Sequence, residues 1–540
     1  MKNIKILFAL TLLALAPSLV SCTGFLDTAP KDALSPGTTW KTQEDAYKFL
    51  VGVYDGWYTG HHLLYAESMS DFGYNFHVHE GYKNIANGEM TPTNNVEHIY
   101  SGSLTKIGQC NRFLEKIEAV KFANEAEKKA WIAEVKAIRG FAYFQLNWVY
   151  GDVPIISSYK NAEEAKVARN SSEEVKAQVY KDLTEAIADL PKEPAETGRI
   201  AKGAALSMLM RAALYYEDYS RVTESAKAIM GLGLYELGPS YSNLFTIAGQ
   251  GSKEIILAIQ ADEQLYSDWT IGSMYNNGEN GWSSAVPTQN LVDTYEMSNG
   301  LAKEEAGSGY DPKHPFANRD PRMAMTVLYP GADWEDGVYD TLTKDFGDTP
   351  NPNYPEQANN ASKTALTWGK YLFPKSQYSN IWQTAVQPIV FRYAEVLLSL
   401  AEAENELSGP SDNVYSLLDQ IRTRVEMPEV NRAKYNTKET LRELIRRERA
   451  VELAGEGIRR FDIVRWKDAS GNPVAMKVLK GDLLRVDGTV DKNVADPTMR
   501  ATITGTVKIE TRNFDLHNRF LPIPQSARDK NPKLTQNKDY

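Results

Sequence analysis

Apolar residues recur at helical spacing in the stretch from Asn124 to Tyr150. They are separated by three, four or seven positions, which places them on one face of a helix. These residues are Trp131, Val135, Ile138, Ala142 and Val149. Gly151 and Pro154 follow, and both residue types favour the end of a helix. The pattern therefore predicts one long helix that ends at Tyr150.

Three further regions carry the same pattern as two helices separated by a short break. They span 203–230 with a break near Asp218, 389–421 with a break at Gly409 and Pro410, and 437–458 with Thr437 as a candidate N-cap and a break at Gly455. The first of them resembles a tetratricopeptide helix pair, although the regular 34-residue period of that repeat is missing. No such pair can bury its apolar stripe alone, so we expect the pairs to stack into an α-superhelical scaffold.

The helix predicted after Ile389 has polar residues along one side. We expect this side to face solvent, opposite a stripe of alanine and leucine. The polar residues are Glu395, Ser399, Glu402 and Glu406.

Two regions lack helical periodicity. Residues 231–387 are rich in Gly, Pro, Asn and Asp with scattered aromatic residues, and 473–518 hold a β-like run from Ala501 to Ile509 beside turn residues. We expect a mainly α fold in which these irregular parts pack against the helices and carry binding loops. The expected parts are a signal peptide (1–21), an N-terminal helical part (22–230), an irregular insertion (231–387) and a C-terminal helical part (388–540).

The first residues have the organisation of a secretory signal peptide. Lys2 and Lys5 precede an apolar run from Ile6 to Leu15, which is shorter than the ~20 residues of a membrane-spanning helix. Leu19 to Ser21 then lead into Cys22, as in the lipobox of bacterial lipoproteins. We expect Cys22 to become the acylated N-terminus, and the alternative is an ordinary cleavage site beside an incidental cysteine. The other cysteine, Cys110, is expected to be a small buried residue.

The net charge of the chain indicates which kinds of molecule it binds poorly. The chain has 60 Lys and Arg against 70 Asp and Glu, and removal of Lys2 and Lys5 with the signal peptide brings the formal charge from −10 to −12. This balance disfavours nucleic acid, because no basic run offsets phosphate repulsion. Tyrosine and tryptophan number 29 and 10, and many lie in loop-like segments where core packing does not explain them.

Short motifs along the chain resemble the SusD/RagB family in their order. They are FLD (25–27), RGFAYFQL (139–146), YGDVP (150–154), NRDPR (318–322), FRYAEVLL (391–398), IRTR (421–424), EGIRRFDIVRW (456–466) and FLPIP (520–524). Most of their charged residues are interpreted as structural. We expect Arg139, Arg392, Arg459, Arg460 and Arg465 to pair with carboxylates such as Glu395, Glu448, Glu452, Glu456 and Asp462.

The resemblance implies a SusD-like fold and a non-catalytic role without a cofactor. Members of the family are lipoproteins on the outer membrane that hold a glycan, or sometimes a peptide, for a TonB-dependent (SusC-like) transporter. Their aromatic residues stack on sugar rings, and Asp, Asn and Arg side chains add hydrogen bonds. The resemblance does not identify the glycan.

Five residues are candidates for ligand binding. Tyr100 stands where the family often has a tryptophan, upstream of Ile107 and Asn111, and core placement of this ring is the alternative. Asp71 lies in a segment that resembles one facing the same site. Trp282, Trp334 and Trp382 lie among Gly, Ser, Asn and acidic residues, which is typical of exposed platforms.

Two other functions remain open at this point. A surface glycoside hydrolase would need two carboxylates, for which Glu335 and Asp336 are candidates, although adjacent acids in a Gly-rich loop are more often solvated. A purely structural protein-interaction module would bind no glycan. Metal binding is not expected, because the pairs His61–His62 and His77–His79 lack further ligands at zinc-like spacing.

The anchor can be tested directly. Replacement of Cys22 by Ser should leave a folded protein in the soluble or periplasmic fraction, because acyl chains supply nearly all of the membrane affinity. Fractionation and detergent partitioning of both proteins measure this, in cells that lack the transporter. Membrane association of the C22S protein would contradict the lipid anchor.

Overall fold

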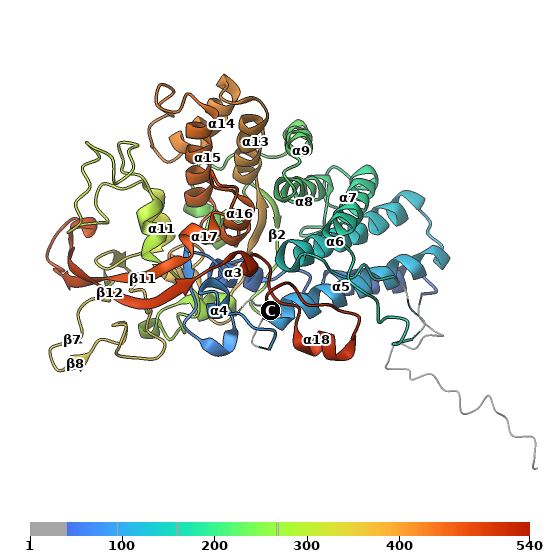
Figure 1. The fold of residues 1–540 in the computed structure, drawn as a ribbon, viewed down its shortest axis with the longest axis horizontal. Helices are drawn as coiled ribbons and strands as arrows, with labels where there is room; N and C mark the ends of the chain where they lie inside the picture. The colour runs from blue at the N-terminus through green and yellow to red at the C-terminus, as the bar shows by residue number, and fades with distance from the viewer. Residues whose placement is uncertain (1–39, 94–95, 158, 160, 266, 268) are drawn as a thin grey trace, which may run out of the picture.

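The first seven long helices lie side by side in chain order, and the last two both pack against the seventh (Figure 1). The computed structural model describes residues 40–540 except 94, 95, 158, 160, 266 and 268. The predicted mainly α fold is confirmed. The long helices are α2 (Gln43–Tyr54), α5 (Glu97–Lys116), α6 (Glu125–Tyr150), α7 (Ser172–Asp189), α8 (Lys202–Tyr215), α9 (Tyr219–Gly231), α13 (Tyr393–Ser408), α14 (Asp412–Thr423) and α15 (Lys438–Glu452).

Side-chain caps and glycine set the ends of these helices where the sequence predicts them. The Asn124 side chain accepts a hydrogen bond from Ala126 N at 3.0 Å and begins α6, and Gly151 ends it with a φ of +72°. Thr437 caps α15 as predicted, accepting from Thr440 N at 3.2 Å. Local sequence therefore determines both ends of α6 and the start of α15.

The polar side of α13 faces the interior, so the expectation that it faces solvent is wrong. Glu395, Ser399 and Glu402 are buried. The Glu395 carboxylate accepts two hydrogen bonds from Arg211, and Glu402 pairs with Arg465 at 2.5 and 2.8 Å. Periodicity separates polar from apolar positions, but it does not show whether the polar side meets water or buried arginine.

The rest of the chain forms short helices and two-stranded antiparallel sheets that pack beside the helical stack (Figure 1). The short helices are α3 (Leu64–Glu67), α4 (Lys83–Ala86), α10 (Thr270–Met274), α11 (Gln289–Thr294), α12 (Arg322–Thr326), α16 (Arg459–Arg465), α17 (Ala475–Val478) and α18 (Gln525–Lys530). The strand pairs are β1 (Gly73–Tyr74) with β3 (Val286–Pro287), β2 (Ile255–Ala258) with β10 (Ile389–Arg392), β4 (Val327–Leu328) with β9 (Thr367–Trp368), β5 (Asp333–Trp334) with β6 (Gly337–Val338), β7 (Asp345–Phe346) with β8 (Thr349–Pro350), and β11 (Lys480–Val490) with β12 (Ala501–Asn513). The predicted β-like run at 501–509 lies in β12.

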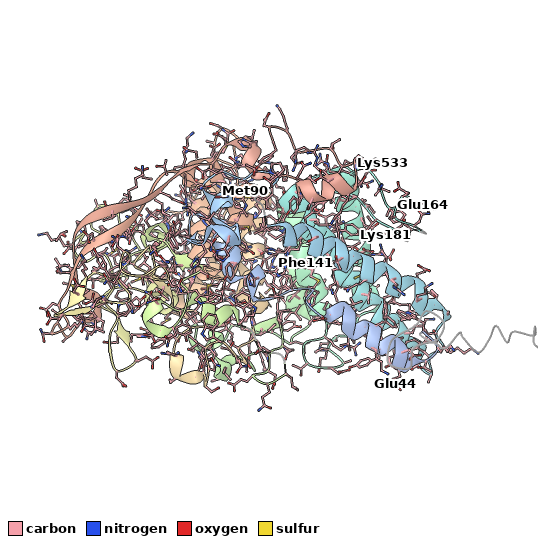
Figure 2. All side chains as sticks on the ribbon, turned by 90° about the horizontal axis from the view of Figure 1, so that it is seen from below. Glu44, Met90, Phe141, Glu164, Lys181 and Lys533 are labelled. Atoms are coloured by element: carbon pink, nitrogen blue, oxygen red, sulfur yellow. The ribbon has the colours of Figure 1, made fainter. Side chains whose placement is uncertain are left out.

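A single large apolar core runs through the helical stack and under the irregular part. Figure 2 shows the side chains that fill this space, with Phe141 of α6 near the middle and Glu44 of α2 toward one end. Cys110 is fully buried, as expected. Within the described residues, no helix combines the length and the apolar character that crossing a bilayer requires.

A network of buried ion pairs joins the helical stack to the irregular part. Its centre is Glu452 at the end of α15, which is fully buried. The Glu452 carboxylate contacts Arg392 at 2.7 Å, Arg322 at 3.1 Å and also Arg424. Burial alone would raise the pKa of Glu452, but the three guanidinium groups outweigh it and hold that pKa well below its ordinary value.

Other arginines of the family motifs also make the expected contacts, with one exception. Arg139 on α6 holds the buried Asp182 of α7 through two hydrogen bonds of 2.8 and 2.6 Å. Arg460 instead donates to the backbone carbonyls of Met69 and Asn518 at 3.1 and 2.8 Å. Burial lowers the pKa of Arg460 to about 10. This side chain ties three distant segments together through hydrogen bonds rather than through an ion pair.

The network predicts a large stability loss for a conservative change at its centre. Glu452→Gln keeps the shape of the side chain but leaves buried arginines with an unbalanced charge, so we expect a loss of about 3–5 kcal/mol in the free energy of unfolding. Urea or thermal unfolding followed by circular dichroism measures it.

The matched control is Glu443→Gln on the same helix. This side chain is 70% exposed and lies 3.5 Å from Arg446, so we expect a change below about 0.5 kcal/mol. Equal effects of the two substitutions would show that the buried network does not hold the fold together.

Candidate functional site

Four aromatic rings from separate segments form a row at the surface of the irregular part. The centroids of Trp382 and Trp282 are 4.5 Å apart, those of Trp282 and Trp269 are 6.1 Å apart, and those of Trp269 and His61 are 4.9 Å apart. Trp269 and Trp282 are 44% and 42% exposed, whereas Trp382 is half-buried. We call these four residues the aromatic row. Large indole faces that remain accessible are available to a ligand.

Close backbone approaches fix the rings of the row. A Cβ atom on Gly272 of α10 would lie 2.7 Å from the Trp382 ring, so the indole rests directly on this helix. A Cβ atom on Gly281 would lie 2.1 Å from the carbonyl oxygen of Tyr275, so only glycine fits immediately before Trp282. Trp282 and Trp382 are therefore held by packed backbone.

Hydrogen bonds hold the turn that presents Trp282. The His77 ring donates from Nε2 to the carbonyl oxygen of Trp282 at 2.9 Å, and because that oxygen can only accept, the bond fixes the His77 tautomer. The buried Asn276 side chain accepts from Asn277 N at 2.7 Å and from Ser362 N at 3.2 Å. Its amide also donates to Tyr339 at 2.7 Å. These bonds make the turn part of the interior framework.

A hollow of about 510 Å³ lies beside Trp282. It is lined by Phe76, His77, His79, Glu80, Trp282, Asn359 and Asn360. Glu80 is already engaged, because its carboxylate accepts hydrogen bonds from Tyr65 at 3.1 Å and Ser284 at 3.0 Å. The hollow therefore combines aromatic faces with amide and imidazole groups, which suits a polar ligand that has apolar faces.

Two of the five residues expected to bind a ligand lie inside the protein. Tyr100 is 2% exposed and packs edge-on against Tyr150 at 5.0 Å, so its alternative placement in the core holds. Asp71 is buried and accepts two hydrogen bonds of 2.8 Å from Arg459. Neither side chain reaches the aromatic row, and both serve the packing of the chain.

Trp334 also differs from the expectation of an exposed platform. It is 7% exposed, and its indole donates to Glu279 at 3.1 Å. Its ring packs near Tyr275 and Phe373, at 6.1 and 5.8 Å. Trp334 thus packs against the segment that leads to Trp282, on its buried side. The structure brings only Trp282 and Trp382 together from the expected set.

Trp269, His61 and His77 are site residues that sequence reasoning missed. Trp269 follows the polar stretch that contains Ser267, which is the same signal that selected Trp282. The histidines carry no such signal, because only the fold brings them to the tryptophans. The His77 and His79 ring centroids lie 5.6 Å apart, and the described residues contain no group of three or more metal-ligating side chains.

The proposed hydrolase pair lies at an exposed turn between β5 and β6. Glu335 and Asp336 both face solvent, and the Glu335 carboxylate accepts a hydrogen bond from Lys375 N at 3.1 Å. The two acids are neighbours in the chain rather than opposed carboxylates across a cleft. The two acids are therefore solvated, which is the alternative given above for acidic neighbours in a Gly-rich loop.

Comparisons with known proteins match this chain to SusD-like proteins. A family model described as "SusD family" matches residues 253–540, and a second, "Starch-binding associating with outer membrane", matches residues 24–214. SusD-like protein P38 of Formosa agariphila is 26% identical, over 87% of this chain and 92% of its own length.

Solved structures agree with these sequence matches. A SusD-like carbohydrate binding protein from Bacteroides fragilis superposes with a TM-score of 0.81 and 28% identity, covering 92% of this chain and 99% of its own. A laminarin binding SusD-like protein has the same fold, with a TM-score of 0.69 and 22% identity over 93% of this chain and all of its own. Together with the ordered motifs and the helical stack, these matches show that the chain belongs to the SusD family.

Proposed function

We propose that this protein binds a glycan non-covalently on the aromatic row and passes it to a TonB-dependent transporter of the outer membrane. The observation that supports the binding step most is the exposed indole of Trp282, which backbone packing holds beside a hollow, next to the exposed indole of Trp269. Folding alone does not require large apolar faces in contact with water. A sugar ring has an apolar face that can cover an indole and hydroxyl groups that can reach amide and imidazole groups.

The size of the site favours a modest affinity. Aromatic stacking contributes about 0.5–1.5 kcal/mol per pair beyond the area that is buried. The row offers few such contacts, and two of the neighbouring polar side chains, Glu80 and His77, already hold hydrogen bonds within the protein. Modest affinity suits a protein that must release its ligand to a partner, because tight complexes dissociate slowly.

Membership of the SusD family supports two further parts of the proposal, the delivery of the glycan to a transporter and the location at the outer membrane. The model "Starch-binding associating with outer membrane" covers the N-terminal part, and the lipobox-like stretch before Cys22 supports attachment to that membrane. The signal peptide and Cys22 lie outside the described residues, so both stay predictions. The partner would be a SusC-like transporter, which receives the glycan from this chain.

The first ligands to try follow from the relatives. One similar structure is a carbohydrate binding protein and another binds laminarin. A panel of laminarin, starch, xylan, mannan and pectin therefore samples neutral and acidic glycans, and affinity electrophoresis identifies those that retard the protein.

Replacement of an exposed indole should weaken binding without loss of stability. We expect Trp282→Ala to lower the affinity for a retained glycan by about 2- to 10-fold, because one stacking contact is lost. Calorimetric titration measures the affinity and thermal melting measures the stability.

Two further variants complete this test. Phe346→Ala is the matched control, because its ring is 41% exposed on β7 outside the row, and we expect no change in affinity. Trp334→Ala should lower the melting temperature, since it empties a buried site. Unchanged affinity for Trp282→Ala would place binding elsewhere, and new reducing ends during incubation would favour a hydrolase.

A further inference from the structure

A second and larger hollow begins at the far end of the aromatic row. Its volume is about 850 Å³, and its walls come from α2 with the turn that follows it, the loop 196–199, and the segment 258–262 after β2. We call it the α2 groove. Trp269 and His61, the last two rings of the row, also line this groove. The neighbouring rings of Trp282 and Trp269 therefore lie between the hollow beside Trp282 and the α2 groove.

The walls of the α2 groove mix apolar faces with amide and hydroxyl groups. Trp57 and Tyr47 contribute half-buried rings, and Val51 is 50% exposed. Gln260 forms a paired amide contact with Gln387, with N···O distances of 3.3 and 3.1 Å. This combination resembles the surroundings of Trp282 and suits a ligand with apolar faces and hydroxyl edges.

Some of the charged side chains along the α2 groove are paired within the protein. Glu196 contacts Arg199 at 3.1 Å and accepts from the Tyr47 hydroxyl at 3.0 Å. Lys48 lies 3.1 Å from Glu44 on the same helix. Asp55 and Asp262 also line the groove, so carboxylates outnumber cations along its walls. The groove therefore favours a neutral ligand over an acidic one.

The loop 196–199 packs closely against another wall of the groove. Gly198 adopts a φ of +86°, and a Cβ atom there would lie 2.3 Å from Cγ of Gln260. Only glycine allows the loop 196–199 to approach the segment after β2 this closely.

Trp40, just before α2, packs on a side of this helix that does not line the groove. Trp40, the first described residue, stacks on Phe49 at 4.2 Å and packs against Phe113 of α5 at 5.5 Å. None of these three residues lines the α2 groove. Trp40 therefore packs on the side of α2 that faces α5, outside the groove.

We propose that the α2 groove is a second binding region for the same glycan, so that a linear neutral chain runs from Trp382 and Trp282 over Trp269 into the groove. This inference rests on the proposed function and defines its ligand class as linear, neutral and longer than the tryptophan platform. A disaccharide can occupy only one region, whereas a longer oligosaccharide contacts both. Affinity therefore rises with chain length.

Gly52 allows the groove to be blocked without damage to the fold. It lies within α2 and lines the groove, and a Cβ atom there meets no other atom within 4 Å. Gly52→Leu fills part of the groove, and leucine is also a better helix former than glycine. The matched control is Gly102→Leu in α5, another exposed helical glycine with open space around its Cβ position, which lies outside the α2 groove.

The test uses laminari-, malto-, xylo- and manno-oligosaccharides from disaccharide to octasaccharide, titrated calorimetrically against the full mature chain. For the series that binds, we expect the wild type and Gly102→Leu to gain about 3- to 10-fold in affinity from the shortest to the longest member. Gly52→Leu should bind short members like the wild type and lose this gain. Thermal melts of all three proteins show whether they are equally folded.

The remaining outcomes separate this inference from the function on which it rests. If the affinity gain with chain length persists in Gly52→Leu, or if the wild type shows no gain, the glycan does not bind in the α2 groove. Glycan binding on the aromatic row is unaffected by either result. Absence of binding by every member of all four series overturns the proposed function, and the groove proposal with it.

Discussion

Three guanidinium groups converge on the carboxylate of Glu452 inside this protein, and the segment that leads to Trp382 of the aromatic row begins beside that contact. Arg392, Arg322 and Arg424 come from β10, from α12 and from the residue that follows α14. Removing such charges from water is costly unless each one finds its partner at close range. The segments can therefore adopt few relative positions, and the network specifies geometry more than it adds stability.

The network continues by contact toward Trp382. Lys370 donates to the Glu452 carbonyl at 3.1 Å and to Glu456 at 2.7 Å, just before Tyr371. Burial lowers the pKa of Lys370 to about 8, while Glu456 acts in the opposite direction and favours the charged form. The Tyr371 hydroxyl accepts from Ile389 N at 3.1 Å, and Tyr378 donates to the Tyr371 carbonyl. A few residues later, Asn380 accepts from Trp382 N at 3.0 Å. The segment that carries Trp382 is thus attached to the ion network at Lys370 and is held by further hydrogen bonds along its length.

The sequence predicts the helices of this fold better than the site. Helix bounds follow from periodicity and caps, both of which are local, as α6 and Thr437 show. Burial of Tyr100 and Trp334 depends on contacts with distant residues such as Tyr150 and Glu279, and a polar neighbourhood in sequence does not reveal those contacts. The same reason explains the polar side of α13, which appears solvent-facing until its arginine partners are known. His61 enters the site only because the fold places it beside Trp269.

Hydrogen–deuterium exchange with and without a glycan that the protein retains shows which segments the bound glycan covers. If the aromatic row is the binding surface, saturating glycan slows amide exchange in the segments around Trp269, Trp282 and Trp382. Exchange around Tyr100 and Asp71, which lie inside the protein, stays unchanged. Slower exchange confined to segments outside the row and the α2 groove would contradict the account.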